Sequence, residues 1–136
     1  MRVETQLSAF LENRAGALAA LADDLARHGI SIHALTIANL VDHAVVRLVV
    51  SDARKAVHLL ESHGVLVVTN DVLAIDIPNE AGALAGVAKR LGRAGVNIEY
   101  AYGSGPKNGG RAVVYVHVSD LTKARRALAP RRRRRR

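Results

Sequence analysis

The chain contains an internal repeat, and a repeat constrains a fold more than any single motif does. Residues 13–32 read NRAGALAALADDLARHGISI and residues 79–98 read NEAGALAGVAKRLGRAGVNI, aligned without a gap at an offset of 66 positions. Further along, VVSD at 49–52 matches HVSD at 117–120, so the offset has grown to 68. The 136 residues therefore hold one supersecondary unit twice.

Each copy begins with a predicted strand followed by a predicted helix. Apolar and polar residues alternate over residues 3–11, which is typical of a strand with one covered face, and Leu73, Ile75 and Ile77 repeat the pattern. Helical spacing then places apolar residues on one stripe in each copy: Leu18, Leu21, Ala22 and Leu25, then Leu84, Val87, Ala88 and Leu91. Gly29 and Gly95 follow where a helix commonly ends in a left-handed residue.

The rest of each copy predicts two strands and a second helix. We expect strands at 30–39 and 44–50 in the first copy and at 96–103 and 111–118 in the second. The alternation within 30–40 is imperfect, which predicts either a bulge or a buried seam there. A hairpin turn is expected at the glycine-rich stretch 103–110. Asp52 and Asp120 are expected to cap the helices that follow, and a strand at 65–69 closes the first copy.

This order, βαββαβ, predicts an α+β fold of two tandem ferredoxin-like units, each an antiparallel sheet with helices on one face. The second unit lacks its last strand, because Ala129 and Pro130 lead directly into six arginines. We expect a first unit at 1–70, a truncated second unit at 71–130 and a disordered tail at 131–136. The missing strand is expected to leave the edge of 73–77 unpaired, open to a second chain or to the connector at 65–71.

Charge and composition narrow the class of protein. The formal charge of +8 falls to 14 basic against 12 acidic residues without the arginine tail, so we expect no specific nucleic-acid site. There is no cysteine, hence no disulfide and no thiolate nucleophile. No stretch reaches the roughly 18 to 20 apolar residues that a membrane helix needs. A soluble, cytoplasmic protein is expected.

Two segments resemble a known family. LENRAGAL before HGISIHALTIA, and PNEAGAL before GVNIEYAY, are similar to the turn and second strand of the ACT domain, with Ala15 and Ala81 where that family often has proline. The resemblance covers about residues 3–128 and points to stand-alone tandem ACT proteins. It implies a non-enzymatic regulatory protein that binds a free amino acid where two units meet, with a homodimer and a partner enzyme of amino-acid metabolism as expected partners.

The expected ligand site has a physical basis at its turn. A glycine that opens a helix leaves backbone N–H groups free at the positive end of the helix dipole, which attracts a carboxylate. Leu18 and Leu84 are expected to anchor the two turns to the core. Strand residues enter only through the resemblance. The expected site residues are Glu12, Asn13, Arg14, Ala15, Gly16, Ala17, Leu18, Thr36, Asn39, Asn79, Glu80, Ala81, Gly82, Ala83, Leu84, Tyr100 and Tyr102.

Other functions find less support in the residues. The six histidines show no helical i, i+4 pair and no nearby carboxylate cluster, so no metal site is expected, and no serine elbow or other catalytic residue is visible. No cofactor is expected. Two alternatives stay open: a ligand-free subunit that regulates a biosynthetic enzyme through its sheet edge, and an RNA-binding module, which shares the βαββαβ order but normally carries more aromatic residues.

Overall fold

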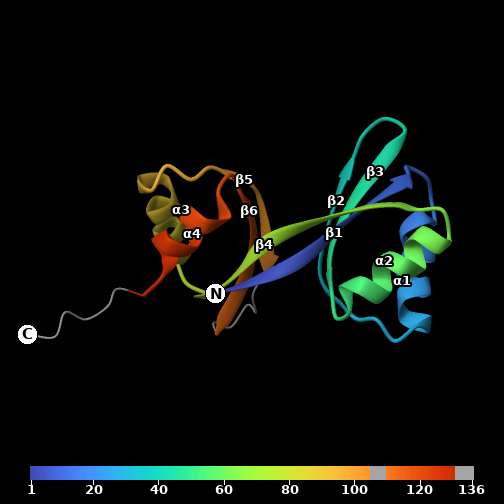
Figure 1. Cartoon of the computed structure of the whole chain (residues 1–136), viewed down its shortest axis with the longest axis horizontal. Helices are drawn as coiled ribbons and strands as arrows, with labels where there is room; N and C mark the ends of the chain where they lie inside the picture. Colours follow the sequence, from blue (N-terminus) through green and yellow to red (C-terminus); the bar gives the residue numbers. More distant parts are fainter. Residues whose placement is uncertain (105–109, 131–136) are drawn as a thin grey trace, which may run out of the picture. The chain divides into compact units, whose positions relative to one another are not determined.

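The computed structural model describes residues 1–104 and 110–130. The expected turn at 103–110 therefore falls largely outside the described residues, and the arginine tail does so entirely. The elements in chain order are β1 (Arg2–Glu12), α1 (Ala17–Arg27), β2 (Ile32–Asn39), β3 (His43–Val50), α2 (Ala53–Ser62), β4 (Leu66–Pro78), α3 (Ala83–Arg93), β5 (Ile98–Ser104), β6 (Arg111–Val118) and α4 (Leu121–Leu128). Figure 1 traces them from blue to red. The α+β class and the βαββαβ-type order of strands and helices are confirmed.

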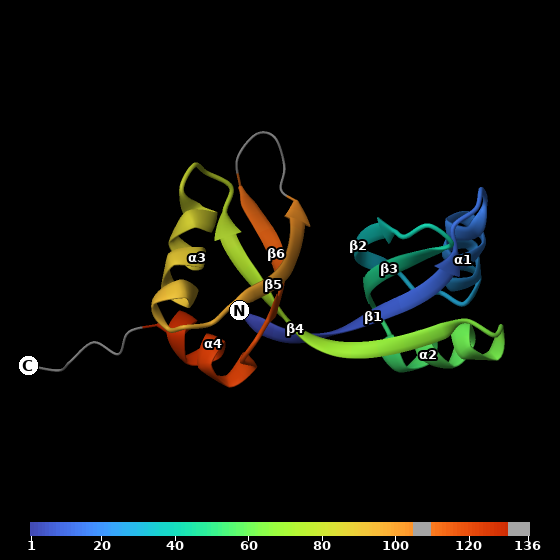
Figure 2. The same ribbon diagram turned by 90° about the horizontal axis from the view of Figure 1, so that it is seen from above.

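Contacts divide the chain into two compact units. The N-terminal unit is Glu4–Asp71, and the C-terminal unit consists of Met1–Val3 together with the chain from Val72 onward. These two names are used below. In each unit the two helices lie on one face of the sheet, as Figure 2 shows for α1 with α2 and for α3 with α4.

The N-terminal unit has the strand order β2-β3-β1-β4, in which β4 contributes residues 66–71. The pairing of β1 with β3 is antiparallel and sets Leu7 opposite Leu48. These two leucines are fully buried against Leu25 of α1 and Leu60 of α2. The apolar stripes of the helices therefore close the core, while β2 is left as an edge strand.

The C-terminal unit has the order β1-β4-β6-β5, with Met1–Val3 beside β4. Leu73 pairs with Val116 and is fully buried in the core that Leu91 of α3 completes. No strand follows α4 in the described chain, which ends at Pro130, as the sequence predicts. The expectation of an unpaired edge at 73–77 was wrong, because the start of β1 occupies that position, and Arg2 forms an ion pair of 3.1 Å with Asp76.

Strand β4 also differs from the prediction. Residues 65–69 and 73–77 were expected as separate strands, and Asn70 and Asp71 between them are residues that favour turns. They belong to one strand of 13 residues, so the connector cannot serve as a pairing partner for 73–77. Tertiary pairing has overridden a local preference here.

Several local signals behave as predicted. The side chain of Asp52 accepts a hydrogen bond from the backbone N–H of Lys55 (3.1 Å), and Asp120 caps α4 in the same way. Gly29 and Gly95 have φ of 69° and 72°, the left-handed conformation expected after a helix. The register of β2 against β3 shifts between Ile32 and Ala34, which confirms the bulge.

One strand is more enclosed than predicted. The expectation for residues 3–11 was a single covered face, yet Gln6 and Ser8, on the face opposite the helices, are also buried.

Candidate functional site

The two repeated turns have nearly identical backbone conformations. Gly16 stands at the start of α1 with φ 86° and ψ −10°, and Gly82 stands at the start of α3 with φ 87° and ψ −12°. A side chain is strained in this conformation, whereas a glycine adopts it freely. The space where a Cβ would project is open at both positions. The backbone angle therefore explains the glycine, and the turn faces open space.

Most donors of these turns are left unsatisfied. Within the described part of the chain, the N–H groups of Ala15, Gly16 and Leu18 form no hydrogen bond, and no side chain caps the helix. The second turn repeats this at the corresponding residues, Ala81, Gly82 and Leu84. Unsatisfied N–H groups at a helix start, together with the helix dipole, form a favourable environment for an anion.

An asparagine ties the first turn to the β2–β3 hairpin. The backbone N–H of Asn13 donates to the carbonyl oxygen of Asp42 (3.2 Å), and its Nδ2 donates to that of Leu40 (3.2 Å). In the second turn the backbone N–H of Asn79 donates to the carbonyl oxygen of Gly110 (2.8 Å). The turn and the hairpin are thus fixed against each other.

A cavity of about 120 Å³ lies between the first turn and the hairpin of the N-terminal unit. Of the expected site residues, those that line it are Glu12, Asn13, Arg14, Ala17, Leu18 and Asn39. Its apolar walls are Leu11, Ile37, Ala44 and Val46, which the sequence analysis did not select. The alternation of β2 could have identified Ile37, because it lies two residues before Asn39 and so on the same face.

The charged residues at this cavity form a local pair. The Nε of Arg14 lies 2.9 Å from Oε2 of Glu12, and both side chains are well exposed. Water screens such a pair, so it contributes little stability and can open to receive a ligand.

The other expected strand residues do not line this cavity. Thr36 faces Arg47 across the β2–β3 pair, on the sheet face away from the helices. Its counterpart Tyr102 stacks on Tyr115 at 5.5 Å between ring centroids. Tyr100 stacks on His117 at 4.9 Å, with the rings 6° from parallel. Both aromatic pairs join β5 to β6, and the residues that line the cavity at the first turn include no aromatic side chain.

The two anchoring leucines differ. Leu18 is half-buried and packs against the core of the N-terminal unit, as expected. Leu84 is 53% exposed, so the expectation that it anchors the second turn was wrong. The position that corresponds to Ile37 is Gly103 in the second copy, and β5 therefore offers no side chain there for Leu84 to contact. Ala83, the residue before Leu84, packs against the core of the C-terminal unit instead.

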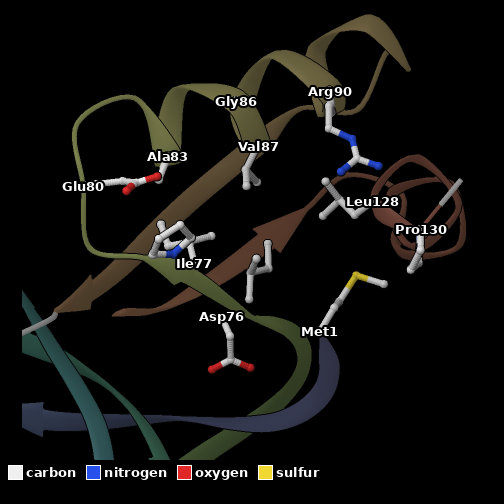
Figure 3. Close-up of a pocket in the computed structure, with 12 residues that line it drawn as sticks. Met1, Asp76, Ile77, Glu80, Ala83, Gly86, Val87, Arg90, Leu128 and Pro130 are labelled. Atoms are coloured by element: carbon white, nitrogen blue, oxygen red, sulfur yellow. The ribbon is translucent and has the colours of Figure 1, made fainter. Parts of the chain in front are cut away.

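A larger cavity, of about 620 Å³, lies in the C-terminal unit between β4, α3 and the end of α4 (Figure 3). Glu80 and Ala83 are the expected site residues that line it, with Arg90 further along α3. Figure 3 shows the Met1 side chain pointing towards the end of α4, where Leu128 and Pro130 lie. A smaller cavity of about 240 Å³ takes the corresponding place beside α1, with Asp24 where the second copy has Arg90.

The described residues include neither a candidate metal-binding cluster nor a helix suited to crossing a membrane. None of them forms a cluster of three or more histidine and carboxylate side chains that could hold a metal ion. None of the helices α1 to α4 combines the length and apolarity that a membrane-spanning helix requires.

Comparison with known proteins identifies a family and similar solved structures for this chain. The family model described as an ACT domain pair matches residues 1–130. The solved structure of protein BT0572 from Bacteroides thetaiotaomicron is 38% identical, with a TM-score of 0.88 over 93% of this chain and 86% of that one. The ligand-free regulatory subunit of aspartate kinase from Thermus thermophilus is 18% identical, with a TM-score of 0.70 over 94% and 95% of the two chains. A search of curated proteins found no match.

Proposed function

The chain belongs to the ACT family as an ACT domain pair, and from this premise we propose that it is a non-catalytic sensor of a free amino acid. The proposal includes an enzyme of amino-acid metabolism as the partner that responds. The main support for the proposal is the set of free N–H groups at the first turn, which lies beside a cavity lined by Asn39.

The ligand carboxylate would lie at the start of α1. The N–H groups of Gly16 and Leu18 have no partner among the described residues, and Gly16 carries no Cβ to block an approach. Hydrogen bonds to a charged group are worth about 1.5–3 kcal/mol each. Leu18 lines the cavity, so this turn would supply backbone donors beside it for an α-carboxylate.

The ligand ammonium requires acceptor oxygens at the same cavity. Asn39 and Glu12, which both carry side-chain oxygens, line it. Binding of an ammonium to the Glu12 carboxylate would replace the exposed Arg14, which costs little because that ion pair is screened by water. The cavity would thus offer backbone donors from the turn, the Glu12 carboxylate next to the turn and the Asn39 amide from β2 to the two charged groups of an α-amino acid.

The size of the cavity favours a short side chain. A volume of 120 Å³ corresponds to about four water molecules at roughly 30 Å³ each. Ile37 and Val46 make the wall apolar. We expect amino acids with few side-chain atoms to bind better than aromatic or long charged ones.

A second copy of the chain would complete the site. Strand β2 is the edge of the N-terminal unit, and Leu35 and Ile37 on it are each about 40% exposed. An edge strand with exposed apolar side chains favours pairing with another strand. Pairing of two copies along β2 would bring a second ACT unit to Asn39 and produce the homodimer that we propose.

A thermal-shift panel of the twenty amino acids tests the proposal. A ligand at a hundredfold excess over its Kd adds about 2.7 kcal/mol, which raises the Tm by roughly 5–10 °C. Asn39→Ala should abolish the shift. Thr36→Ala is the matched control, because Thr36 lies on the same strand but faces away from the cavity.

A flat panel would contradict amino-acid sensing. If the protein then still bound a biosynthetic enzyme, the ligand-free subunit would be the better description. A response that survives in Asn39→Ala and fails in Thr36→Ala would place the site on the other face of the sheet.

A further inference from the structure

We propose that the helical face of the C-terminal unit, formed by α3 and α4, binds the phosphate backbone of nucleic acid without sequence preference. The two helices carry six basic residues and no acidic one. These residues, named the basic face below, are Lys89, Arg90, Arg93, Lys123, Arg125 and Arg126. All six are exposed.

The positive charge of the basic face is not neutralised within its own unit. None of its six residues forms an ion pair with another described residue. The helices pack against each other, and three of the arginines, Arg90, Arg93 and Arg126, line a surface hollow of about 500 Å³ whose other walls are alanine and proline. Arg90 donates to the carbonyl oxygen of Ala129 at 3.2 Å, which holds its guanidinium at the hollow.

The internal repeat supplies a control for this charge. The residues of the first copy that correspond to Lys89 and Arg90 are Asp23 and Asp24. There, Arg27 forms ion pairs of 2.8 Å with Asp23 and 3.5 Å with Asp24, so the helical face of the N-terminal unit is neutralised locally. One scaffold therefore presents a neutralised face in one copy and an uncompensated cationic face in the other. The packing of the fold does not require the basic residues.

The chemistry of the basic face favours phosphate over a protein partner. Protein interfaces depend on buried aromatic and other large apolar residues, and the hollow offers only Ala94, Ala127, Ala129 and Pro130. Arginine binds phosphate with two parallel hydrogen bonds, and four of the six basic residues are arginine. No aromatic side chain lies on α3 or α4 to stack on a base, so sequence preference is not expected. Six further arginines follow Pro130 in the sequence.

Fluorescence anisotropy with a labelled DNA duplex of about 20 base pairs tests the proposal, with single-stranded RNA as a second probe of the same phosphate chemistry. The full chain and a chain ending at Pro130 are both titrated over about 50–200 mM salt. The shorter chain should still bind. A plot of the logarithm of its binding constant for the duplex against the logarithm of the salt concentration should have a slope no steeper than about −5, the value for phosphate contacts by all six basic residues. Two scrambled sequences should bind equally.

The decisive comparison uses two double variants of the shorter chain. Arg93→Glu with Arg126→Glu should weaken binding by about tenfold or more at low salt and reduce the slope by about 2. Arg27→Glu with Arg54→Glu makes the same change in net charge on the helices of the N-terminal unit, and should change affinity much less. Circular dichroism melting curves check that both variants remain folded.

Three results would overturn the proposal. They are loss of all binding when the arginine tail is removed, equal weakening by the two double variants, and competition by polyglutamate as strong as that by DNA of equal charge. The last result would identify an acidic protein as the partner. Amino-acid sensing is independent of all three, because Asn39 and the first turn are unchanged in every variant.

Discussion

Gly82→Ala and Gly86→Ala change residues four positions apart, and their effects on stability should have opposite signs. Gly82 has φ 87° at the start of α3, and an alanine in the left-handed region costs about 1–2 kcal/mol. Alanine also lowers the conformational entropy of the unfolded chain, which stabilises the folded protein by about 0.4–1 kcal/mol. We expect a net loss near 1 kcal/mol, with no steric part, because the space beyond Gly82 is open.

Gly86 lies inside α3 without a positive φ, and a Cβ there would meet nothing within 4 Å. Alanine should gain about 0.8–1 kcal/mol of helix propensity at this position. The first copy has Ala20 at the corresponding position, so the scaffold already accepts this side chain. The two variants should therefore differ in stability by about 2 kcal/mol.

Urea denaturation measures this difference as a shift of midpoint at constant m-value. An unfolding entropy of about 2.1 cal/mol/K per residue gives roughly 3–4 °C per kcal/mol for a chain of this length, so the melting temperatures should lie about 7 °C apart. Gly16→Ala should reproduce the loss in the first copy. A Gly82→Ala protein as stable as the parent would refute the account of these turns as conformationally specified.

The remaining predictions concern caps, strand packing and the edge of the C-terminal unit. Asp52→Ala and Asp120→Ala should each cost about 1 kcal/mol in urea denaturation, since each carboxylate satisfies a backbone donor, and a loss below about 0.3 kcal/mol in both would contradict the capping role. Gly103→Ala should destabilise the β5–β6 pair by about 1–3 kcal/mol, because the new Cβ would collide with a backbone carbonyl oxygen of β6; unchanged hydrogen exchange in β5 would contradict this. Arg2→Ala should cost no more than about 0.5 kcal/mol, since its ion pair with Asp76 is exposed on both sides; a loss of several kcal/mol would show that the ion pair, rather than the strand, holds this edge.

Local signals of the sequence predicted the local structure well. The caps at Asp52 and Asp120, the left-handed Gly29 and Gly95 and the bulge in β2 each depend on a few neighbouring residues, and each is confirmed. The turn that carries Asn13 and Arg14 could be selected for the same reason, because it recurs in the second copy.

Features that depend on distant contacts could not be predicted in this way. The placement of Met1–Val3 beside β4 joins residues more than 70 positions apart, and no periodicity encodes such a pairing. The exposure of Leu84 depends on Gly103 in another strand, whereas the helical stripe depends only on α3 itself. The stacking of Tyr102 on Tyr115 follows from the register of β5 against β6, which a strand prediction leaves open.

The position of Met1–Val3 has a consequence for how the protein folds. Residues Met1–Val3 cannot take their place until β4 has been synthesised, and the Arg2–Asp76 contact then closes a loop of 74 residues. Contacts of such long separation slow folding, because chain entropy is lost before they form. A polypeptide started at residue 71 would lack the strand segment that borders β4, so we expect it to be less stable than the same unit in the full chain, although its sequence repeats the pattern of the first copy.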